Sequence, residues 1–236
     1  MSEVQTIDRP QVFISENKNG GVKNLSTVSI FRTRGMVPAS VMQVWGSLIT
    51  PMNHRYAAVI QSGKAADEAL NQGVEFVLND PNVKHFKYIL FMDDDNLPPV
   101  DGLLTLTETI GDYDGISGLY VTKFQPHWPL ILGDPKNVND FTPQAHTEGI
   151  HECNGMGMGF VLVKIDVFRK MPKPWFKMVE RPEPGIKRMQ EDLYFFWNAR
   201  KQGFRFAVNC SVRVGHLNTT NGMVYYPTKP KEPDNG

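Results

Sequence analysis

Residues 88–99 read YILFMDDDNLPP. Five apolar residues run directly into three consecutive carboxylates, Asp93, Asp94 and Asp95, and two prolines end the segment. A short, continuous apolar run is typical of a strand that is covered on both faces of a sheet. Ligands of open parallel sheets bind beyond the carboxyl ends of the strands. We therefore expect a buried strand whose end presents the three carboxylates to a ligand.

Similar apolar runs alternate with helical patterns on both sides of this strand. Strands are expected at about 27–31, 56–60 and 114–121, and helices at about 38–49 and from Gly63. This alternation predicts an α/β fold with a mixed, mainly parallel sheet that is flanked by helices. A polar stretch at 133–152 exceeds the usual loop length of about 4–6 residues, so it is either a functional flap or contains elements that the pattern does not reveal.

The chain of 236 residues is expected to form a single domain over 27–226. Residues 1–26 contain one short apolar patch, Val12-Phe13-Ile14, which indicates an N-terminal arm or a peripheral strand. Residues 227–236 are polar and rich in proline, which predicts a flexible C-terminal tail.

The composition argues against several classes of protein. Lys and Arg together number 25, as do Asp and Glu, so no net field attracts nucleic acid. No stretch approaches the roughly 18 apolar residues of a membrane span, and the first residues lack the pattern of a signal peptide. Cys153 and Cys210 have no CxxC spacing and are expected to be buried thiols. We expect a soluble, cytoplasmic protein without an integral membrane segment.

Three adjacent carboxylates repel one another, and a positive group or solvent must offset that repulsion. Side chains alternate along an extended segment, so Asp93 and Asp95 should point to one side and Asp94 to the other. Hard oxygen ligands suit Mg²⁺ or Mn²⁺, which would bridge to phosphate oxygens of a substrate. The pattern predicts a divalent-metal site at Asp93 and Asp95. The alternative is an acidic turn that caps nearby backbone amides.

The last apolar segment, FRFAVNCSVRVGH at 204–216, places apolar residues at every even position up to Val214. Continued alternation puts His216 on the inward side. Neutral imidazole is a common ligand of divalent transition metals, so His216 is a candidate to complete a site with Asp95. The alternative is a core histidine that is hydrogen-bonded to a backbone carbonyl.

A third motif, QEDLYFFW, places Glu191 and Asp192 in the first turn of a helix, where the helix dipole favours the ionised carboxylate. A carboxylate aimed at a cleft could deprotonate a hydroxyl, although acidic first turns also serve as simple capping features. The glycines of GMGMG at 155–159 lack the GxGxxG spacing of a dinucleotide site. They predict either close backbone approach to a ligand or a tight turn.

The order of these motifs resembles that of the GT-A glycosyltransferases, the nucleotide-diphosphosugar transferases, and in particular their DxD-containing, family-two-like branch. The resemblance covers about Thr27 to Leu217 and includes the opening SIFRTRG. It implies a GT-A, Rossmann-like fold and a hexosyltransferase-like enzyme that uses Mn²⁺ or Mg²⁺. Such an enzyme would move a sugar from a nucleotide-diphosphate donor, a UDP- or GDP-sugar, to a hydroxyl of a glycan or another compound.

The resemblance also implies roles for individual residues. Metal ligands would be Asp93, Asp95 and His216, with Asp95 the direct ligand and Asp93 nearer the ribose and diphosphate. In an inverting transfer Asp192 would be the general base, and Glu191 is the neighbour that could exchange roles with it. The residues that would bind the donor are Arg32, Thr33, Arg34, Gln61, Ser62, Asp93, Asp94 and Gly157.

The chain departs from the family pattern at 65–68 and in the insert at 133–152, which has no counterpart in the family, and three other functions remain open. Many relatives carry an Arg-Asn pair where this chain has 65–68, AADE, and Lys64 is the candidate to replace that contact. A non-catalytic nucleotide-sugar-binding domain would bind ligand without turnover. A phosphatase of the haloacid-dehalogenase type would need Thr or Val where Asn96 stands, and a nucleophile near the start of the chain. A nucleotidyltransferase would need a longer phosphate loop than 32–35 offers.

Overall fold

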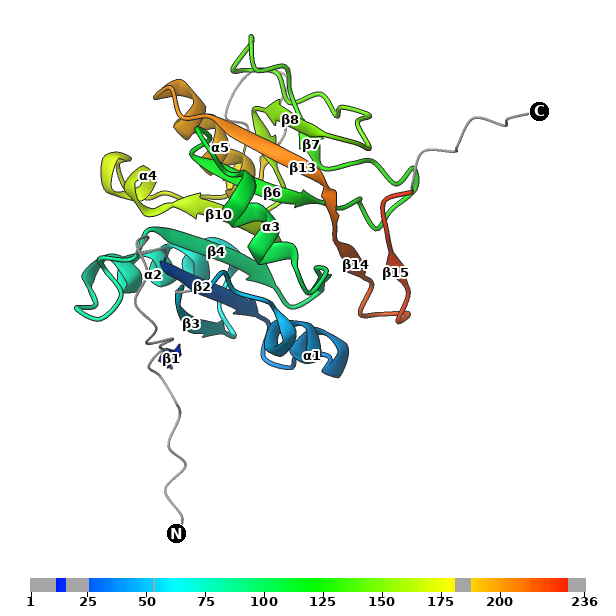
Figure 1. Ribbon diagram of the computed structural model, residues 1–236. Coiled ribbons are helices and arrows are strands. Elements are labelled where there is room, and N and C mark those ends of the chain that lie inside the picture. The colour runs from blue at the N-terminus through cyan, green and yellow to red at the C-terminus, as the bar shows by residue number, and fades with distance from the viewer. Residues whose placement is uncertain (1–11, 16–25, 53, 181–187, 229–236) are drawn as a thin grey trace.

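The computed structural model describes residues 12–15, 26–52, 54–180 and 188–228. Its centre is an eight-stranded sheet with the order β1-β3-β2-β4-β10-β6-β13-β8 (Figure 1). The strands of this sheet are β1 (Val12–Ser15), β2 (Ser26–Thr33), β3 (Arg55–Ser62), β4 (Tyr88–Asp93), β6 (Gly115–Leu119), β8 (Ile150–Cys153), β10 (Phe160–Lys164) and β13 (Phe206–Arg213).

Five helices and seven short strands complete the described chain. The helices are α1 (Ala39–Ser47), α2 (Ala66–Asn79), α3 (Gly102–Thr109), α4 (Ile165–Lys170) and α5 (Glu191–Lys201). The short strands are β5 (Asn96–Leu97), β7 (Ile131–Leu132), β9 (Gly155–Met156), β11 (Val179–Glu180), β12 (Arg188–Met189), β14 (Gly215–Leu217) and β15 (Val224–Tyr225).

The sheet is mixed, as predicted. β3, β2 and β4 run parallel, and so do β6 and β13. β10 lies antiparallel between β4 and β6, so these two strands point the same way. The carboxyl ends of β2, β4 and β6 therefore meet at one edge, the position where open α/β sheets bind ligands.

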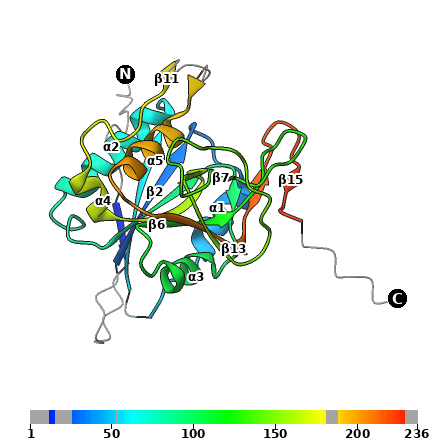
Figure 2. The ribbon, with the colours of Figure 1, turned by 90° about the horizontal axis from the view of Figure 1, so that it is seen from above.

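Both faces of the sheet are buried, which explains the continuous apolar runs of β2 and β4. Along β2, Ile30 packs in the core that α2, α4 and α5 cover, and Phe31 packs in the core of α1 and α3. Phe31 stacks on Trp45 of α1 with ring centroids 4.2 Å apart. Figure 2 shows α2, α4 and α5 on one side of the sheet and α3 on the other.

β13 breaks the simple alternation predicted for 204–216. Val208 packs in the same core as α5, whereas Val212 packs in the core on the α3 side. The pairing of β13 with β6 shifts register between Asn209 and Arg213, and such an irregularity turns the following side chains to the other face. The prediction that all even-numbered residues of 204–216 lie on one face is therefore wrong. The position of the segment after residue 213 is set by a different contact.

That contact is the pairing of β14 with β5. His216 lies opposite Asn96, the residue that follows the three carboxylates. β14 is thus brought beside the end of β4, although the two segments are about 120 residues apart in the chain. This pairing brings His216 to within 3.8 Å of Asp95, and the metal site predicted for the two residues stays a prediction.

Further predictions concerned the two ends of the chain, the two cysteines and the absence of a membrane span. Val12–Ser15 is a peripheral strand that pairs with β3, and the remainder of 1–26, apart from Ser26, lies outside the described residues. The same is true of the tail beyond residue 228. Cys153 and Cys210 are buried free thiols, as predicted. None of the described helices has the length and apolar character needed to cross a membrane.

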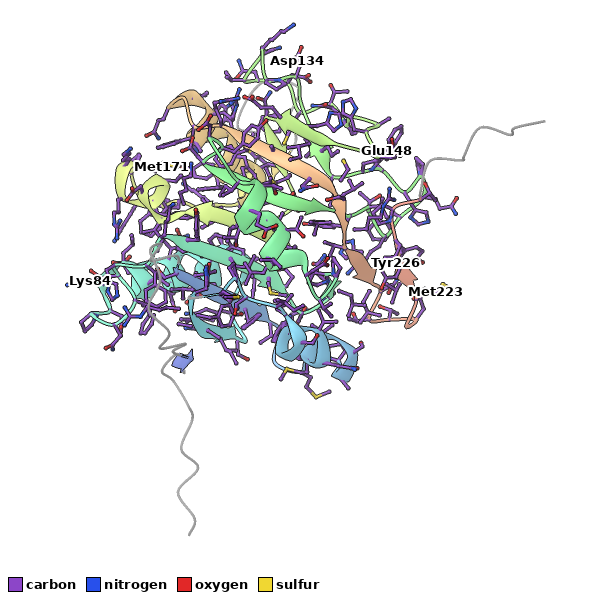
Figure 3. All side chains as sticks on the ribbon, viewed as in Figure 1. Lys84, Asp134, Glu148, Met171, Met223 and Tyr226 are labelled. Atoms are coloured by element: carbon purple, nitrogen blue, oxygen red, sulfur yellow. The ribbon has the colours of Figure 1, made fainter. Side chains whose placement is uncertain are left out.

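The stretch 133–152 is an extended, internally bonded loop that ends in β8. The side-chain amide of Asn154 donates to the backbone carbonyls of Asp134, Asn137 and Asp140 at 2.7–2.9 Å. Figure 3 shows the segment spread along the β8 side of the molecule, from Asp134 to Glu148. Its turns are thus held from the core by Asn154, together with Arg200, whose Nη2 donates to the Pro135 carbonyl at 2.8 Å.

Candidate active site

A cavity of about 610 Å³ lies at the edge where β2, β4 and β6 end, and the sequence motifs converge on it. It brings together Asp93 and Asp95 of the acidic motif, Glu191 and Asp192 of α5, and His216 of β14. Gly157, Tyr120, Lys123 and Asn96 also line it. These residues, from five separate parts of the sequence, therefore share one solvent-accessible space.

A smaller cavity of about 240 Å³ adjoins it. Its lining residues are Arg32, Thr33, Arg34, Lys64, Ala66, Asp93, Asp94 and Asp95. Arg32, Asp93 and Asp95 line both cavities, so the acidic motif forms the boundary between them. The site has two adjoining compartments, and three basic and three acidic side chains line the smaller one.

Arg32 links the acidic motif to α5. Its Nε and Nη2 atoms donate to the two carboxylate oxygens of Asp93 at 2.8 and 2.5 Å. Nη1 lies 3.3 Å from the Glu191 carboxylate. Burial opposes the charged form of the guanidinium, but Asp93 and Glu191 outweigh it and raise the pKa of Arg32. The bidentate geometry fixes both oxygens of Asp93 toward the protein.

Asp94 points away from the larger cavity, as strand alternation predicts, and binds the segment that follows β2. It accepts hydrogen bonds from the backbone N–H of Arg34 at 2.8 Å and from its Nη2 at 2.7 Å. Burial raises the pKa of Asp94, but the bonds from Arg34 outweigh burial and leave the pKa below its ordinary value. Asp94 therefore orders the wall of the smaller cavity.

Asp95 is paired with Lys123, whose Nζ lies 2.5 Å from its Oδ2 atom. Nη2 of Arg34 lies 3.6 Å from the same oxygen. Each of the three carboxylates thus has its own cation: Arg32 for Asp93, Arg34 for Asp94 and Lys123 for Asp95. The repulsion that the sequence predicts is offset by side chains of this chain.

The second oxygen of Asp95 faces His216, with 3.8 Å between Oδ1 and Nε2. Nδ1 of His216 lies 2.8 Å from the Val121 carbonyl, and since a carbonyl can only accept, Nδ1 carries the proton. Burial lowers the pKa of His216, which favours the neutral ring. Its Nε2 lone pair therefore points toward Asp95. The hydrogen bond to a backbone carbonyl, one of the two interpretations of this histidine, is present, and its role as a metal ligand stays a prediction.

A divalent ion fits between these two side chains. Carboxylate oxygen and imidazole nitrogen both suit Mn²⁺, and the Val121 carbonyl is the kind of outer partner that orients a ligating histidine. Among the described residues no group of three or more His, Cys, Asp or Glu side chains could hold a metal ion. Two protein ligands suit an ion that takes its remaining ligands from substrate phosphate and water.

Asp192 differs from the other carboxylates because it makes no salt bridge within the described part of the chain. Burial raises its pKa to about 7, with further repulsion from Glu191. Its carboxylate accepts a hydrogen bond from the Leu193 N–H at 2.7 Å. Burial and the neighbouring charge therefore oppose the ionised form that the helix dipole favours.

The glycines of 155–159 make room for neighbouring side chains of the protein. A Cβ on Gly157 would lie 2.0 Å from the hydroxyl oxygen of Tyr120, and a Cβ on Gly159 would lie 2.1 Å from Oδ1 of Asn96. The Tyr120 hydroxyl in turn accepts a hydrogen bond from the Gly159 N–H at 2.9 Å. Close approach is thus the reason for the glycines, and the approaching groups are a tyrosine and an asparagine.

Tyr120 and Lys123 line the site but were not predicted from the sequence. Two residues that were predicted to bind the donor, in contrast, do not line either of these two cavities. Tyr120 lies edge-on to His216, with ring centroids 5.4 Å apart. Gln61 is buried and Ser62 is exposed, and neither is among the described residues that line the two cavities. Lys64, the candidate replacement contact, lines the smaller cavity instead.

Comparison with known proteins gives the fold. Neither a protein-family model nor a curated protein matches the sequence. The solved structure of A197 from STIV matches 87% of this chain and 96% of its own, at 18% identity and a TM-score of 0.60. GalNAc-T7, solved with UDP, GalNAc and Mn²⁺, matches 85% of this chain at 11% identity and a TM-score of 0.55. This chain covers 45% of GalNAc-T7, so the match concerns one part of that protein.

Proposed function

The chain has the GT-A fold of glycosyltransferases, and we propose that it is a metal-dependent glycosyltransferase of the hexosyltransferase type. One observation carries this proposal: Asp93, Asp95, Glu191, Asp192 and His216 all line a single cavity at the carboxyl ends of the strands. Fold alone would not support an activity, because one fold supports many functions. The convergence of an acidic pair, a histidine and a candidate base is what supports it.

The nucleotide of the donor would occupy the smaller cavity and its sugar the larger one. Arg34 and Lys64 offer positive charge to the nucleotide side. A UDP-sugar is the first candidate donor, because the GalNAc-T7 structure contains UDP, and a GDP-sugar is the second. The acceptor would present a hydroxyl, of a glycan or another compound, to the side of the larger cavity near Asp192.

A bound Mn²⁺ or Mg²⁺ would be held by Asp95 and His216, and its chemistry is to stabilise the charge of the leaving diphosphate. Asp93 was predicted as a ligand, but Arg32 engages both of its oxygens, so we assign it to the positioning of donor-binding groups. Asp192 would accept the proton of the acceptor hydroxyl. A pKa of about 7 suits that role, since a general base works best near the operating pH.

This proposal is tested by a thermal-shift panel of UDP, GDP, CDP, ADP and dTDP. Each nucleotide is measured with Mn²⁺, with Mg²⁺ and with EDTA, on the wild type and on Asp95→Ala. A ligand at about 100 times its Kd stabilises by roughly 2.7 kcal/mol, which is readily detected. We expect one nucleotide to raise the Tm with metal in the wild type and not in Asp95→Ala. No shift with any nucleotide would overturn the proposal.

A non-catalytic nucleotide-sugar-binding domain is the second candidate. The observation in its favour is that all three carboxylates of the acidic motif are already paired with protein cations. Such a domain would give the same thermal shift but would never release nucleoside diphosphate from the matching sugar nucleotide. Release by the wild type, and its loss in Asp192→Asn, would decide for the enzyme.

A further inference from the structure

Lys123 occupies the carboxylate that the proposed metal ion needs. Its Nζ atom lies 2.5 Å from Oδ2 of Asp95, and both side chains are largely shielded, at 18% and 14% exposed. The other oxygen of Asp95 faces Nε2 of His216 at 3.8 Å. An ammonium and a divalent cation would therefore share one carboxylate, and like charges at such distances repel strongly. The two cations are antagonists at Asp95.

The position of Lys123 is set by a hydrogen-bonded hairpin. Thr122 N–H donates to the Trp128 carbonyl and Leu130 N–H donates to that of Tyr120, at 2.9 and 3.0 Å. The Thr122 hydroxyl also donates to the carbonyl of Phe124 at 3.1 Å. The backbone of Lys123 is thus held over the larger cavity, and only its flexible side chain has to move when a cation arrives.

We infer that Lys123 is a displaceable counter-ion: it holds Asp95 in the absence of metal, and once an ion takes Asp95 its ammonium moves to the diphosphate of the donor. This inference rests on the proposed function. Lys123 lines the larger cavity together with Asp93, Asp95 and His216, so its released ammonium remains beside the space assigned to the donor. A bound metal and a bound diphosphate each stabilise the displaced lysine, which makes metal and nucleotide bind cooperatively.

The inference predicts effects of opposite sign from one substitution. Lys123→Gln should bind Mn²⁺ alone at least about tenfold more tightly than the wild type, because the ion no longer breaks a charged hydrogen bond. The same variant should bind UDP, or whichever nucleotide the panel identifies, about tenfold more weakly at saturating Mn²⁺, because the diphosphate loses a cation. A lysine with a purely structural role would not produce this pair of changes.

The affinity for Mn²⁺ is measured from the electron paramagnetic resonance signal of the free ion. The affinity for nucleotide is measured by titration calorimetry. Lys64→Gln removes the same charge from the smaller cavity without touching Asp95, since its Nζ contacts Gln61 and Gln72. It should leave the affinity for Mn²⁺ within about threefold of the wild type, the scatter expected for surface charges. Lys123→Arg keeps the positive charge and should retain the low affinity for Mn²⁺.

Each outcome is decisive. Equal or weaker Mn²⁺ binding by folded Lys123→Gln overturns the inference, and so does an equal gain in Lys64→Gln. If no nucleotide binds any variant while Mn²⁺ binds Lys123→Gln more tightly, the proposed function fails and the antagonism at Asp95 stands. If a nucleotide binds together with Mn²⁺ but Lys123→Gln has the same affinity for Mn²⁺ as the wild type, the proposed function stands and the role inferred for Lys123 is wrong.

Discussion

Asp192→Asn should make the protein more stable and less active. The pKa of Asp192 is raised from 3.8 to about 7, mainly by burial and next by Glu191. The unfolded chain loses this proton near pH 4, whereas the folded protein keeps it up to about pH 7. The contribution of Asp192 to stability is therefore fully present below pH 4 and is lost as pH rises toward 7.

The size of the effect follows from the shift. About three pKa units at 1.36 kcal/mol each give an upper limit of about 4 kcal/mol at pH 8. Since the side chain is only half-buried and water screens it, we expect about 1–2 kcal/mol. Asparagine cannot ionise, so Asp192→Asn should gain this amount over the wild type at pH 8 and gain nothing at pH 4.

Urea denaturation at pH 4, 5, 6, 7 and 8 measures the difference. Asp67→Asn is the matched control, because Asp67 lies in the first turn of α2 and accepts the N–H of the next residue just as Asp192 does in α5. That variant should not reproduce the gain. A constant difference between Asp192→Asn and the wild type across this pH range would refute the reasoning. If the protein is a transferase, the rate of transfer by Asp192→Asn should also fall about 10²–10⁴-fold, since a general base contributes that much.

Two further predictions concern the packing behind the site. Gly157→Ala should cost about 1–3 kcal/mol in urea denaturation, because its Cβ would overlap the Tyr120 hydroxyl, whereas Gly46→Ala in α1 meets nothing within 4 Å and should cost nothing. Asn154→Ala should cost about 2–3 kcal/mol and expose the loop at 134–140 to trypsin at Lys136, because three carbonyls lose their donor; unchanged resistance to trypsin would show that the loop is held by other contacts.

The sequence predicted those parts of the site that local pattern determines. The apolar run of β4 fixes where Asp93 to Asp95 emerge, and strand alternation correctly separates Asp94 from its neighbours. The first turn of α5 is equally readable, because acidic residues precede an apolar helical face. Each of these features depends on residues within one turn or one strand of each other.

What sequence reasoning missed depends on contacts between distant segments. Arg32 is 61 residues from Asp93 and 159 from Glu191, yet it joins them. Lys123 is 28 residues from Asp95 and carries no motif of its own. Periodicity reports which face of an element is buried but not which element it meets. The irregularity in β13 is likewise a property of the pairing with β6 and not of the sequence 204–216.

The pairing of charges explains how an acidic motif can serve an anionic ligand. Three free carboxylates would repel a diphosphate. Here Asp93 is neutralised by Arg32 at the end of β2, and Asp94 is neutralised by Arg34, which follows that strand. Only Asp95 is held by a cation from a hairpin, and only its second oxygen faces a neutral histidine. Exchange of that one ammonium for a divalent ion would add positive charge where the diphosphate arrives and would release the lysine toward it. Asp192, left without a salt bridge among the described residues, would remain the group that can take up a proton.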